Sequence, residues 1–313
     1  MLSKFKSPVF ALLGSSILWG VAGPIIKLTL NYIPPFTFLV IRFLIAAFVL
    51  FYMVPWKKHN YVKHLGFKGF LKMFLLGILG SSINLGLYFV AIDQTSAIEG
   101  TIIYSMGPIF VFLGGIIFLK ESVSKKEMVG FFITLIGFIV IIINPIIGGK
   151  ATDVDKHLIG NIVMLFSALS WGSYAVLTKY LYNKDNSGKI SSPIFLTFIT
   201  SFAGAITLLP LCINEILSEN INFISSLPGV VYMAICSSVF AFVLYSYGIK
   251  KIDVSHVSFF EYLIPAISMP FAILFLNEKF SYLYVIGFIF LGTGLYVTQR
   301  VPKHIKHLKK IYQ

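Results

Sequence analysis

The chain has 313 residues, of which 57% are hydrophobic and only 12% are charged, and its mean hydropathy is +0.88. A soluble domain is about a quarter charged, so this composition excludes an ordinary soluble fold and predicts an all-α integral membrane protein. The formal net charge of +13 does not indicate nucleic-acid binding, because the lysines lie in short segments between apolar blocks, where membrane orientation and anionic lipid headgroups account for them.

Ten apolar blocks follow one another along the chain, each close to the length of about 20 residues that crosses the ~30 Å hydrocarbon layer as a helix. The blocks are continuously apolar, which disfavours a membrane barrel, because barrel strands alternate between apolar and polar residues. The first block follows a basic start in the manner of a signal peptide, but its apolar run is too long for one, and we expect a retained helix. The expected helices lie at residues 8–30, 36–54, 70–92, 96–119, 127–146, 158–182, 193–213, 226–250, 254–276 and 281–298.

The basic residues of the loops indicate how these helices are oriented. If both termini are cytoplasmic, most of the 25 Lys and Arg residues lie on the cytoplasmic side, and only Lys150, Lys156 and Lys279 lie in segments on the opposite side. Positively charged loops remain in the cytoplasm. We therefore expect a multi-pass protein of the cell membrane with cytoplasmic N- and C-termini.

The second half of the chain repeats the first. Residues 169–179 match 17–27, and residues 237–300 match 80–143 without a gap. The repeat pairs Trp19 with Trp171, Gly20 with Gly172, Lys27 with Lys179, Ser81 with Ser238, Tyr88 with Tyr245, Pro108 with Pro265, Glu121 with Glu278, Gly130 with Gly287, and Gly137 with Gly294.

Each half contains five expected helices, an odd number, so the second half must enter the membrane from the opposite side. The chain then divides into a first five-helix repeat at 1–146, an external connecting loop at 147–157, an inverted second repeat at 158–300 and a basic cytoplasmic tail at 301–313. Inverted repeats are a common way to build secondary transporters, because exchanging the conformations of the halves changes which side is open. This organisation disfavours a purely structural or receptor-like role.

The repeated positions also carry a family resemblance. They include Trp19, Gly20, Lys27, Pro35, Arg42, Pro108, Glu121, Gly130 and Gly137 in the first half, with echoes at Trp171, Lys179, Pro265, Glu278, Gly287 and Gly294. Together, over nearly the whole chain, they resemble the EamA-type family of the drug/metabolite transporter superfamily. The resemblance implies a ten-helix bundle around a central cavity, with amino acids, other metabolites or drugs as cargo, and it specifies the fold better than the substrate.

The halves differ at one informative place. Aligning Pro35 with Pro193 puts Thr200 where Arg42 stands, so the arginine of the second helix is not duplicated. We therefore expect the enclosed site to be electrostatically asymmetric.

Ionisable side chains within the expected helices are the first candidates for substrate contact. A charge at a helix centre costs about 2.5–3.5 kcal/mol, so it should face protein, water or a partner. Helix directions predict an outer cluster and an inner cluster, and the repeat equates Glu99 with His256 and Tyr104 with Glu261. The outer cluster contains Lys27, Arg42 and Glu99, and the inner cluster contains Lys179, His256 and Glu261.

Two interpretations of these charges stay open. In the first, Arg42 and less directly Lys27 meet an anionic group such as a substrate carboxylate, while Glu261 or Glu99 takes an ammonium group or a proton. In the second, the charges pair with each other or with backbone carbonyls, or extend to the interface. The second applies most to Lys27 and Lys179, which lie close to the expected interface.

Aromatic residues inside the helices are further candidates. Trp19 and Trp171 lie well within their blocks, away from the interfacial belt, and either line a cavity or pack between helices. Tyr88, Tyr104 and Tyr245 could line a cavity with their hydroxyl groups.

Other repeated residues suggest structural roles. Pro24, Pro108 and Pro265 predict helix kinks. The glycines paired seven residues apart share a helical face and predict close helix packing. Glu121 and Glu278, at helix ends, are expected to orient loops.

The sequence lacks the motifs of the main alternatives to secondary transport. It has no phosphate-binding G-x-x-x-x-G-K-[ST] loop and no H-E-x-x-H motif, and Cys212 and Cys236 lack metal-type spacing, so we expect neither an enzyme nor a cofactor or metal. One cationic and one acidic cluster suit a zwitterion, so the leading substrate is an amino acid or related metabolite, exported with protons or by facilitated diffusion. Multidrug or lipophilic-cation efflux and nucleoside or sugar-conjugate transport are alternatives. The expected partners are this small molecule, protons and membrane lipid, without nucleic acid, and the oligomeric state stays open.

Overall fold

The computed structural model describes residues 3–56, 61–94, 103–145, 158–184, 192–219, 221–276 and 282–298, and the regular structure within these ranges is helical. The first half contains α1 (Ser3–Thr29), α2 (Pro35–Met53), α3 (Tyr61–Gly77), the π-helical segment η1 (Ile78–Ile83), α4 (Asn84–Gln94), α6 (Gly107–Leu119) and α7 (Lys125–Pro145). The second half contains α8 (Leu158–Lys184), α9 (Pro193–Ser218), α10 (Phe223–Tyr232), the π-helical segment η4 (Met233–Ala241), α11 (Phe242–Lys251), α12 (Val254–Glu261), α13 (Leu263–Leu276) and α14 (Tyr282–Thr298).

Six helical runs in the described part of the chain are long and apolar enough to cross a membrane. Two of them combine three consecutive helical segments, α3 with η1 and α4, and α10 with η4 and α11. They are Ser7–Thr29, Pro35–Met53, Gly66–Ala91, Leu158–Lys184, Pro193–Ser218 and Phe223–Lys251.

The distribution of side chains suits a bilayer. Large apolar side chains point outward, as at Phe118 (76% exposed) and Leu217 (82% exposed), whereas Thr37 and Ser81 are fully buried. Lipid tails accept apolar surface but offer no hydrogen bonds, so polar groups turn inward to find partners. The bundle therefore has an apolar exterior, and its interior holds buried polar groups among apolar core clusters.

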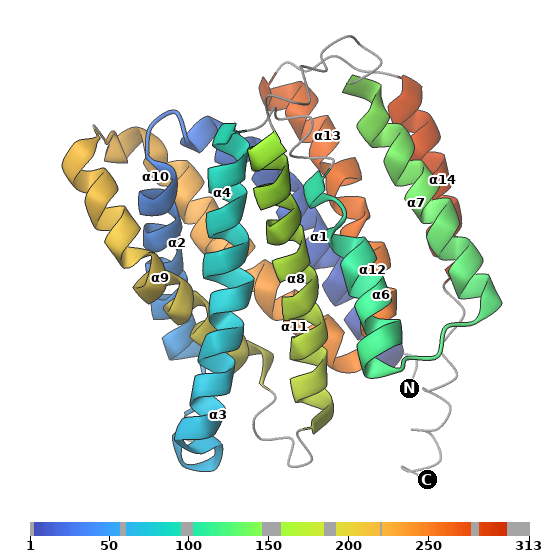
Figure 1. Ribbon diagram of the computed structural model, residues 1–313, viewed down its shortest axis with the longest axis horizontal. Helices are drawn as coiled ribbons and strands as arrows, with labels where there is room; N and C mark the ends of the chain where they lie inside the picture. The colour runs from blue at the N-terminus through green and yellow to red at the C-terminus, as the bar shows by residue number, and fades with distance from the viewer. Residues whose placement is uncertain are drawn as a thin grey trace.

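Equivalent helices of the two halves have equivalent neighbours. Helices α4, α8 and α6 stand side by side across the front of the bundle (Figure 1). Helix α2 packs against α9, and α7 packs against α14. The contact of α1 with α11 is matched by that of α8 with α4, and the contact of α1 with α13 by that of α8 with α6.

Two of the expected proline kinks are helix starts instead. Pro24 lies inside α1, but Pro108 is the second residue of α6 and Pro265 is the third residue of α13. Proline is tolerated in a first turn, where its missing N–H would have no helical partner. The chain turns at residues 105–106 before α6 and at Tyr262 between α12 and α13, which are equivalent positions in the sequence repeat.

Gly20 and Gly172 allow the first helix of each half to approach a neighbour closely. A Cβ atom at Gly20 would lie 2.6 Å from Cγ2 of Ile267 on α13, and one at Gly172 would lie 2.6 Å from Cβ of Phe110 on α6. Small residues permit such approach in membrane bundles. The repeated Trp-Gly pair thus places a tryptophan beside a close helix contact.

We expect Gly20→Ala to destabilise the fold by about 1–3 kcal/mol, because the new methyl group overpacks the contact of α1 with α13. Thermal unfolding in detergent, followed with a thiol-reactive dye that labels Cys212 and Cys236 as they become accessible, would measure the change. The matched control is Gly292→Ala, where a Cβ atom would meet no other atom within 4 Å. Equal melting temperatures for Gly20→Ala and the unmodified chain would contradict the prediction.

Candidate functional site

The π-helical segments η1 and η4 occupy equivalent places in the two halves, and each turns one side toward the interior. Each contains one of the paired serines, Ser81 and Ser238, both nearly fully buried. Segment η4 packs against α2, and η1 packs against α9. Single-turn π-helical irregularities are frequent at functional sites, which makes this layer of the bundle the place to look for one.

Arg42 is the charged group of this layer. It lies on α2, is 3% exposed, and donates a hydrogen bond from Nε to Oγ of Ser238 at 3.0 Å. Its guanidinium carbon lies 5.1 Å from the centre of the Phe43 ring. In the other half, Ser81 instead donates its hydroxyl to the backbone carbonyl of Thr200 at 3.1 Å. In both halves the paired serine therefore bonds to the equivalent position of the opposite repeat, but only Ser238 bonds to a charged side chain.

Glu261 is the buried acid of the site. It ends α12, directly before the turn at Tyr262, and is 5% exposed. Its Oε1 accepts hydrogen bonds from Nε1 of Trp171, at 3.1 Å, and from the hydroxyl of Tyr245. Its Oε2 is buried without a hydrogen-bond partner in the described structure. Oε1 of this carboxyl group is therefore held by two donors, whereas Oε2 is available to a ligand.

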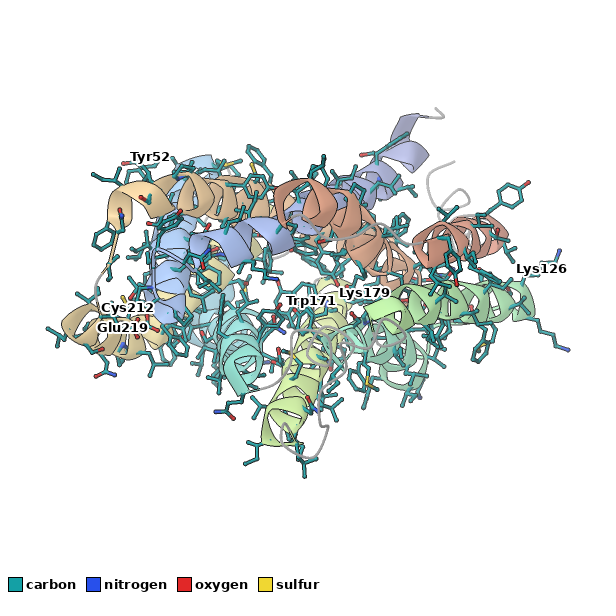
Figure 2. All side chains as sticks on the ribbon, turned by 90° about the horizontal axis from the view of Figure 1, so that it is seen from above. Tyr52, Lys126, Trp171, Lys179, Cys212 and Glu219 are labelled. Atoms are coloured by element: carbon teal, nitrogen blue, oxygen red, sulfur yellow. The ribbon has the colours of Figure 1, made fainter. Side chains whose placement is uncertain are left out.

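Aromatic rings from three helices surround this acid. Trp19 on α1 and Trp171 on α8 meet edge to face with ring centres 5.4 Å apart, and Tyr245 lies 5.1 Å from Trp19 and 5.2 Å from Trp171. Seen from above, Trp171 lies toward the middle of the bundle, whereas Tyr52 and Lys126 lie at its edges (Figure 2). Nε1 of Trp19 also donates to the backbone carbonyl of Ser237 in η4 at 3.3 Å.

Tyr88 and Tyr104 form the corresponding contact in the first half. Their ring centres are 4.9 Å apart, and the Tyr104 hydroxyl donates to Oδ1 of Asn84 at 3.4 Å. The sequence repeat equates this pair with Tyr245 and Glu261, so a neutral phenol stands where the second half has an acid. Tyr104 is close enough to interact electrostatically with both Arg42 and Glu261. It thus lies near both side chains.

The other candidate charges have separate partners. Lys179 donates from Nζ to the carbonyls of Ile249 at 3.0 Å and Ile252 at 2.8 Å, which fits the structural interpretation of this lysine. His256 lies 3.1 Å from Oε1 of Glu127, measured from Nε2. Lys179, His256 and Glu261 therefore bond to different partners rather than to one another.

The outer cluster is described only in part. Lys27 is exposed near the end of α1, where its ammonium group can reach the interface, and Arg42 is buried against η4. Glu99 lies outside the described residues, as does Glu278.

Several carboxylates and serines that were not candidates for substrate contact have clear positions. Glu121 accepts hydrogen bonds from the backbone N–H groups of Val254 at 2.8 Å and Ser255 at 2.9 Å, in the loop-orienting role expected for it. Glu215 in the same way accepts from the backbone N–H group of Thr37 at the start of α2. For Ser238, the pairing with Ser81 in the repeat was the one available signal.

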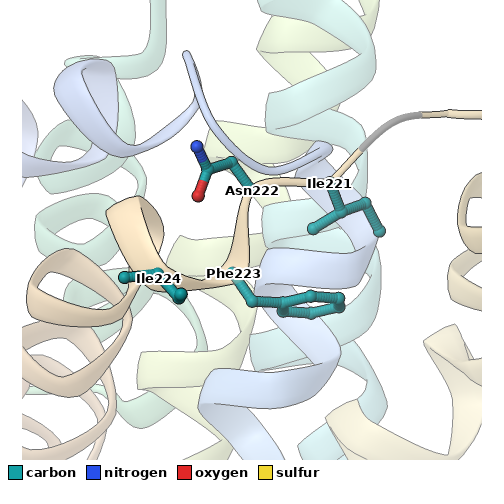
Figure 3. Close-up of a pocket in the computed structure, with 4 residues that line it drawn as sticks. All are labelled: Ile221, Asn222, Phe223 and Ile224. Atoms are coloured by element: carbon teal, nitrogen blue, oxygen red, sulfur yellow. The ribbon is translucent and has the colours of Figure 1, made fainter.

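Two open pockets of the described structure lie away from these side chains. One, of about 490 Å³, is lined by Ile221–Ile224, where Asn222 caps the start of α10 (Figure 3). The other, of about 370 Å³, is lined by aromatic side chains of α3 and α9 together with Trp56. Neither is the expected central cavity, which stays a prediction. Among the described residues, no group of three His, Cys, Asp or Glu side chains could hold a metal.

Comparison with known proteins adds a family match. A sequence model of the EamA-like transporter family matches residues 6–143 and again residues 158–300. An uncharacterized transporter of Archaeoglobus fulgidus is 27% identical over 284 residues, covering 90% of this chain and 93% of that protein. The uncharacterized transporter YyaM of Bacillus subtilis is 27% identical over 304 residues, or 94% of each chain.

Two further similarities concern a more specific name and the fold. A probable amino-acid metabolite efflux pump of Escherichia coli is 22% identical over 302 residues, covering 93% of this chain and 94% of the relative. A crystal structure with 17% sequence identity matches 94% of this chain and 96% of its own with a TM-score of 0.74, so the two chains share a fold.

Proposed function

We propose that this chain, which belongs to the EamA-like transporter family, moves a small zwitterionic metabolite, such as an amino acid, by alternating access. It is a multi-pass membrane transporter rather than an enzyme. Arg42 would bind the anionic group and Glu261 the ammonium group. We further propose export as its direction, with protons as the coupling ion or with no coupling ion. The name of the Escherichia coli relative agrees with this substrate class.

We propose ten membrane helices in two inverted repeats, at 1–146 and 158–300, as the scaffold for this cycle. The family model matches each half separately, and equivalent helices have equivalent neighbours. Helices α6, α7 and α14, together with the broken pair α12 and α13, would add four crossings to the six long runs. In this scheme the segment 147–157 is external and both termini are cytoplasmic.

The observation that carries the proposal is a basic and an acidic side chain, both buried, that form no ion pair with each other. Arg42 and Glu261 have no ion-pair partner among the described residues, and Oε2 of Glu261 has no hydrogen bond. A buried charge without a partner is costly, so a ligand that supplies both complementary groups gains affinity from each. A zwitterion supplies an anion for Arg42 and a cation for Glu261.

A second candidate function is favoured by the aromatic residues around the acid. Trp19, Trp171 and Tyr245 surround Glu261, and aromatic faces next to a carboxylate also suit a lipophilic cation. Such a substrate would not need Arg42. The two candidates therefore differ in whether the anionic group of the substrate matters.

Transport by the purified protein in proteoliposomes tests both functions. A panel of labelled amino acids is assayed with and without an imposed pH gradient, and the amino acid with the highest flux is then competed with its amide, which lacks the carboxylate, and with its deaminated acid. We expect saturable flux of at least one zwitterion, with both analogues competing at least about tenfold more weakly, because each loses one charged contact.

Liposomes without protein are the control for leakage. Flux of tetraphenylphosphonium without flux of any zwitterion would overturn the zwitterion proposal in favour of cation efflux. Full competition by the amide would also overturn it, because Arg42 would then have no ligand group to bind.

A further inference from the structure

Segment η4 connects two of the candidate site residues of the opposite repeat. The carbonyl of Ser237 accepts a hydrogen bond from Trp19 on α1, and the hydroxyl of the next residue, Ser238, accepts one from Arg42 on α2. The wider i→i+5 turn of a π-helical segment changes which backbone and side-chain groups face the neighbouring helices. Two adjacent residues of η4 thus fix side chains from two different helices.

The bond to Ser238 uses one particular edge of the Arg42 guanidinium group. Nε is the donor, at 3.0 Å, and the terminal nitrogens make no bond to another described residue. A guanidinium group has five N–H donors in one plane, and its two terminal nitrogens form a fork that matches the two oxygens of a carboxylate. Anchoring Nε therefore fixes the plane of the group and leaves this fork available.

The other repeat shows what the same serine does without an arginine. Ser81 of η1 is a donor, and its hydroxyl bonds to the carbonyls of Gly77, at 2.6 Å, and Thr200, at 3.1 Å. Thr200 occupies the position that corresponds to Arg42. Ser81 therefore bonds only to backbone carbonyls, whereas Ser238 bonds to a charged side chain. Ser81 is thus a matched control for Ser238 within the same chain.

We propose that Ser238 is a positioning residue that holds Arg42 by Nε, so that the two terminal nitrogens bind a planar carboxylate group of the substrate end-on. This inference rests on the proposed function in taking Arg42 as the anion-binding group. It adds how the anion is recognised. It also adds that Ser238, which does not contact the substrate, sets the orientation of the Arg42 guanidinium group.

Chemical modification of arginine tests the inference without a transport assay. The sequence contains two arginines, Arg42 and Arg300, so phenylglyoxal adducts can be assigned by mass spectrometry. In the full-length protein in proteoliposomes, we expect acetate to protect Arg42, whereas chloride of equal ionic strength does not. Arg300 reports that the reagent is active throughout.

Variants of the two serines then separate positioning from packing. We expect Ser238→Ala to raise the half-protecting acetate concentration about tenfold, the effect of losing one charge-assisted hydrogen bond. Ser238→Thr, which keeps the hydroxyl, and Ser81→Ala should protect as the unmodified chain does. Where a transported zwitterion is known, Ser238→Ala should raise its half-saturating concentration about tenfold with little change in maximal flux.

Several results would overturn the inference. If Arg42 never reacts with phenylglyoxal, it is not on the transport pathway. If Ser238→Ala and Ser81→Ala change the half-protecting acetate concentration equally, the serines have a general packing role. Loss of the proposed function looks different, because acetate protection that depends on Ser238 would persist while no zwitterion is transported. Zwitterion transport with unchanged protection in Ser238→Ala would leave the function standing and remove this inference.

Discussion

Replacing Glu261 with glutamine should lower zwitterion flux by about a hundredfold, because the site then lacks the charge that binds the ammonium group. Glutamine keeps an oxygen that can accept from Trp171 and Tyr245, so the packing at the end of α12 should persist. Arg42→Ala should reduce the flux by a similar factor through loss of the anion contact. Initial rates of labelled amino-acid counterflow in proteoliposomes measure both effects, without depending on any coupling ion.

Glu219→Gln is the matched control for the loss of one carboxylate. Glu219 is exposed after the end of α9. The zwitterion flux of Glu219→Gln should therefore equal that of the unmodified chain. Undiminished zwitterion flux in both Glu261→Gln and Arg42→Ala would remove the two-charge site. If tetraphenylphosphonium is the substrate instead, Glu261→Gln should stop its transport and Arg42→Ala should not.

The sequence repeat predicted which residues occupy equivalent places. It paired Ser81 with Ser238 and equated Tyr104 with Glu261, and the structure places each pair in equivalent surroundings, one serine in each π-helical segment and one side chain at each helix break. The lack of a second arginine opposite Arg42 was equally visible from the alignment. The alignment of the two repeats depends only on the sequence, so it predicts equivalent positions without a structure.

Side-chain partners could not be predicted in the same way. The direction of a helix predicts how deep a residue lies in the membrane, but not which way its side chain points around the helix axis. His256 and Glu261 share an inner depth, yet they are five residues apart on a helix with 3.6 residues per turn, so their side chains point about 140° apart. His256 therefore meets Glu127 on α7, while Glu261 meets Trp171 on α8.

Proline had a similar ambiguity. Its ring forbids an N–H bond in a helix interior but fits the first turn, and the sequence around Pro108 did not reveal that a helix begins there. The breaks before α6 and α13 matter for the site, because Tyr104 and Glu261 lie just before them. Discontinuous helices are where transporters commonly place binding groups.

Glu121 connects the end of α6 to the start of α12, and its loss should destabilise the fold strongly. Lys120 ends α6 with φ of 55°, and this left-handed turn is followed directly by Glu121, which accepts from the N–H groups of Val254 and Ser255. The N-cap residue Asp253 makes no side-chain cap bond, so Glu121 supplies the cap from another helix. Both capped residues are almost fully buried, where water cannot easily replace a lost acceptor.

We expect Glu121→Ala to cost about 2–4 kcal/mol, since two buried donors lose a charged acceptor at a helix N-terminus. Glu121→Gln should cost less, because its amide oxygen can still accept one of the two bonds. Thermal unfolding read by the accessibility of Cys212 and Cys236 gives the comparison, with Glu219→Ala as the exposed carboxylate control. If Glu121→Ala and Glu219→Ala melt at the same temperature, α12 does not need this cap. The position of Glu261 one helix length away would then depend on Trp171 and Tyr245 alone.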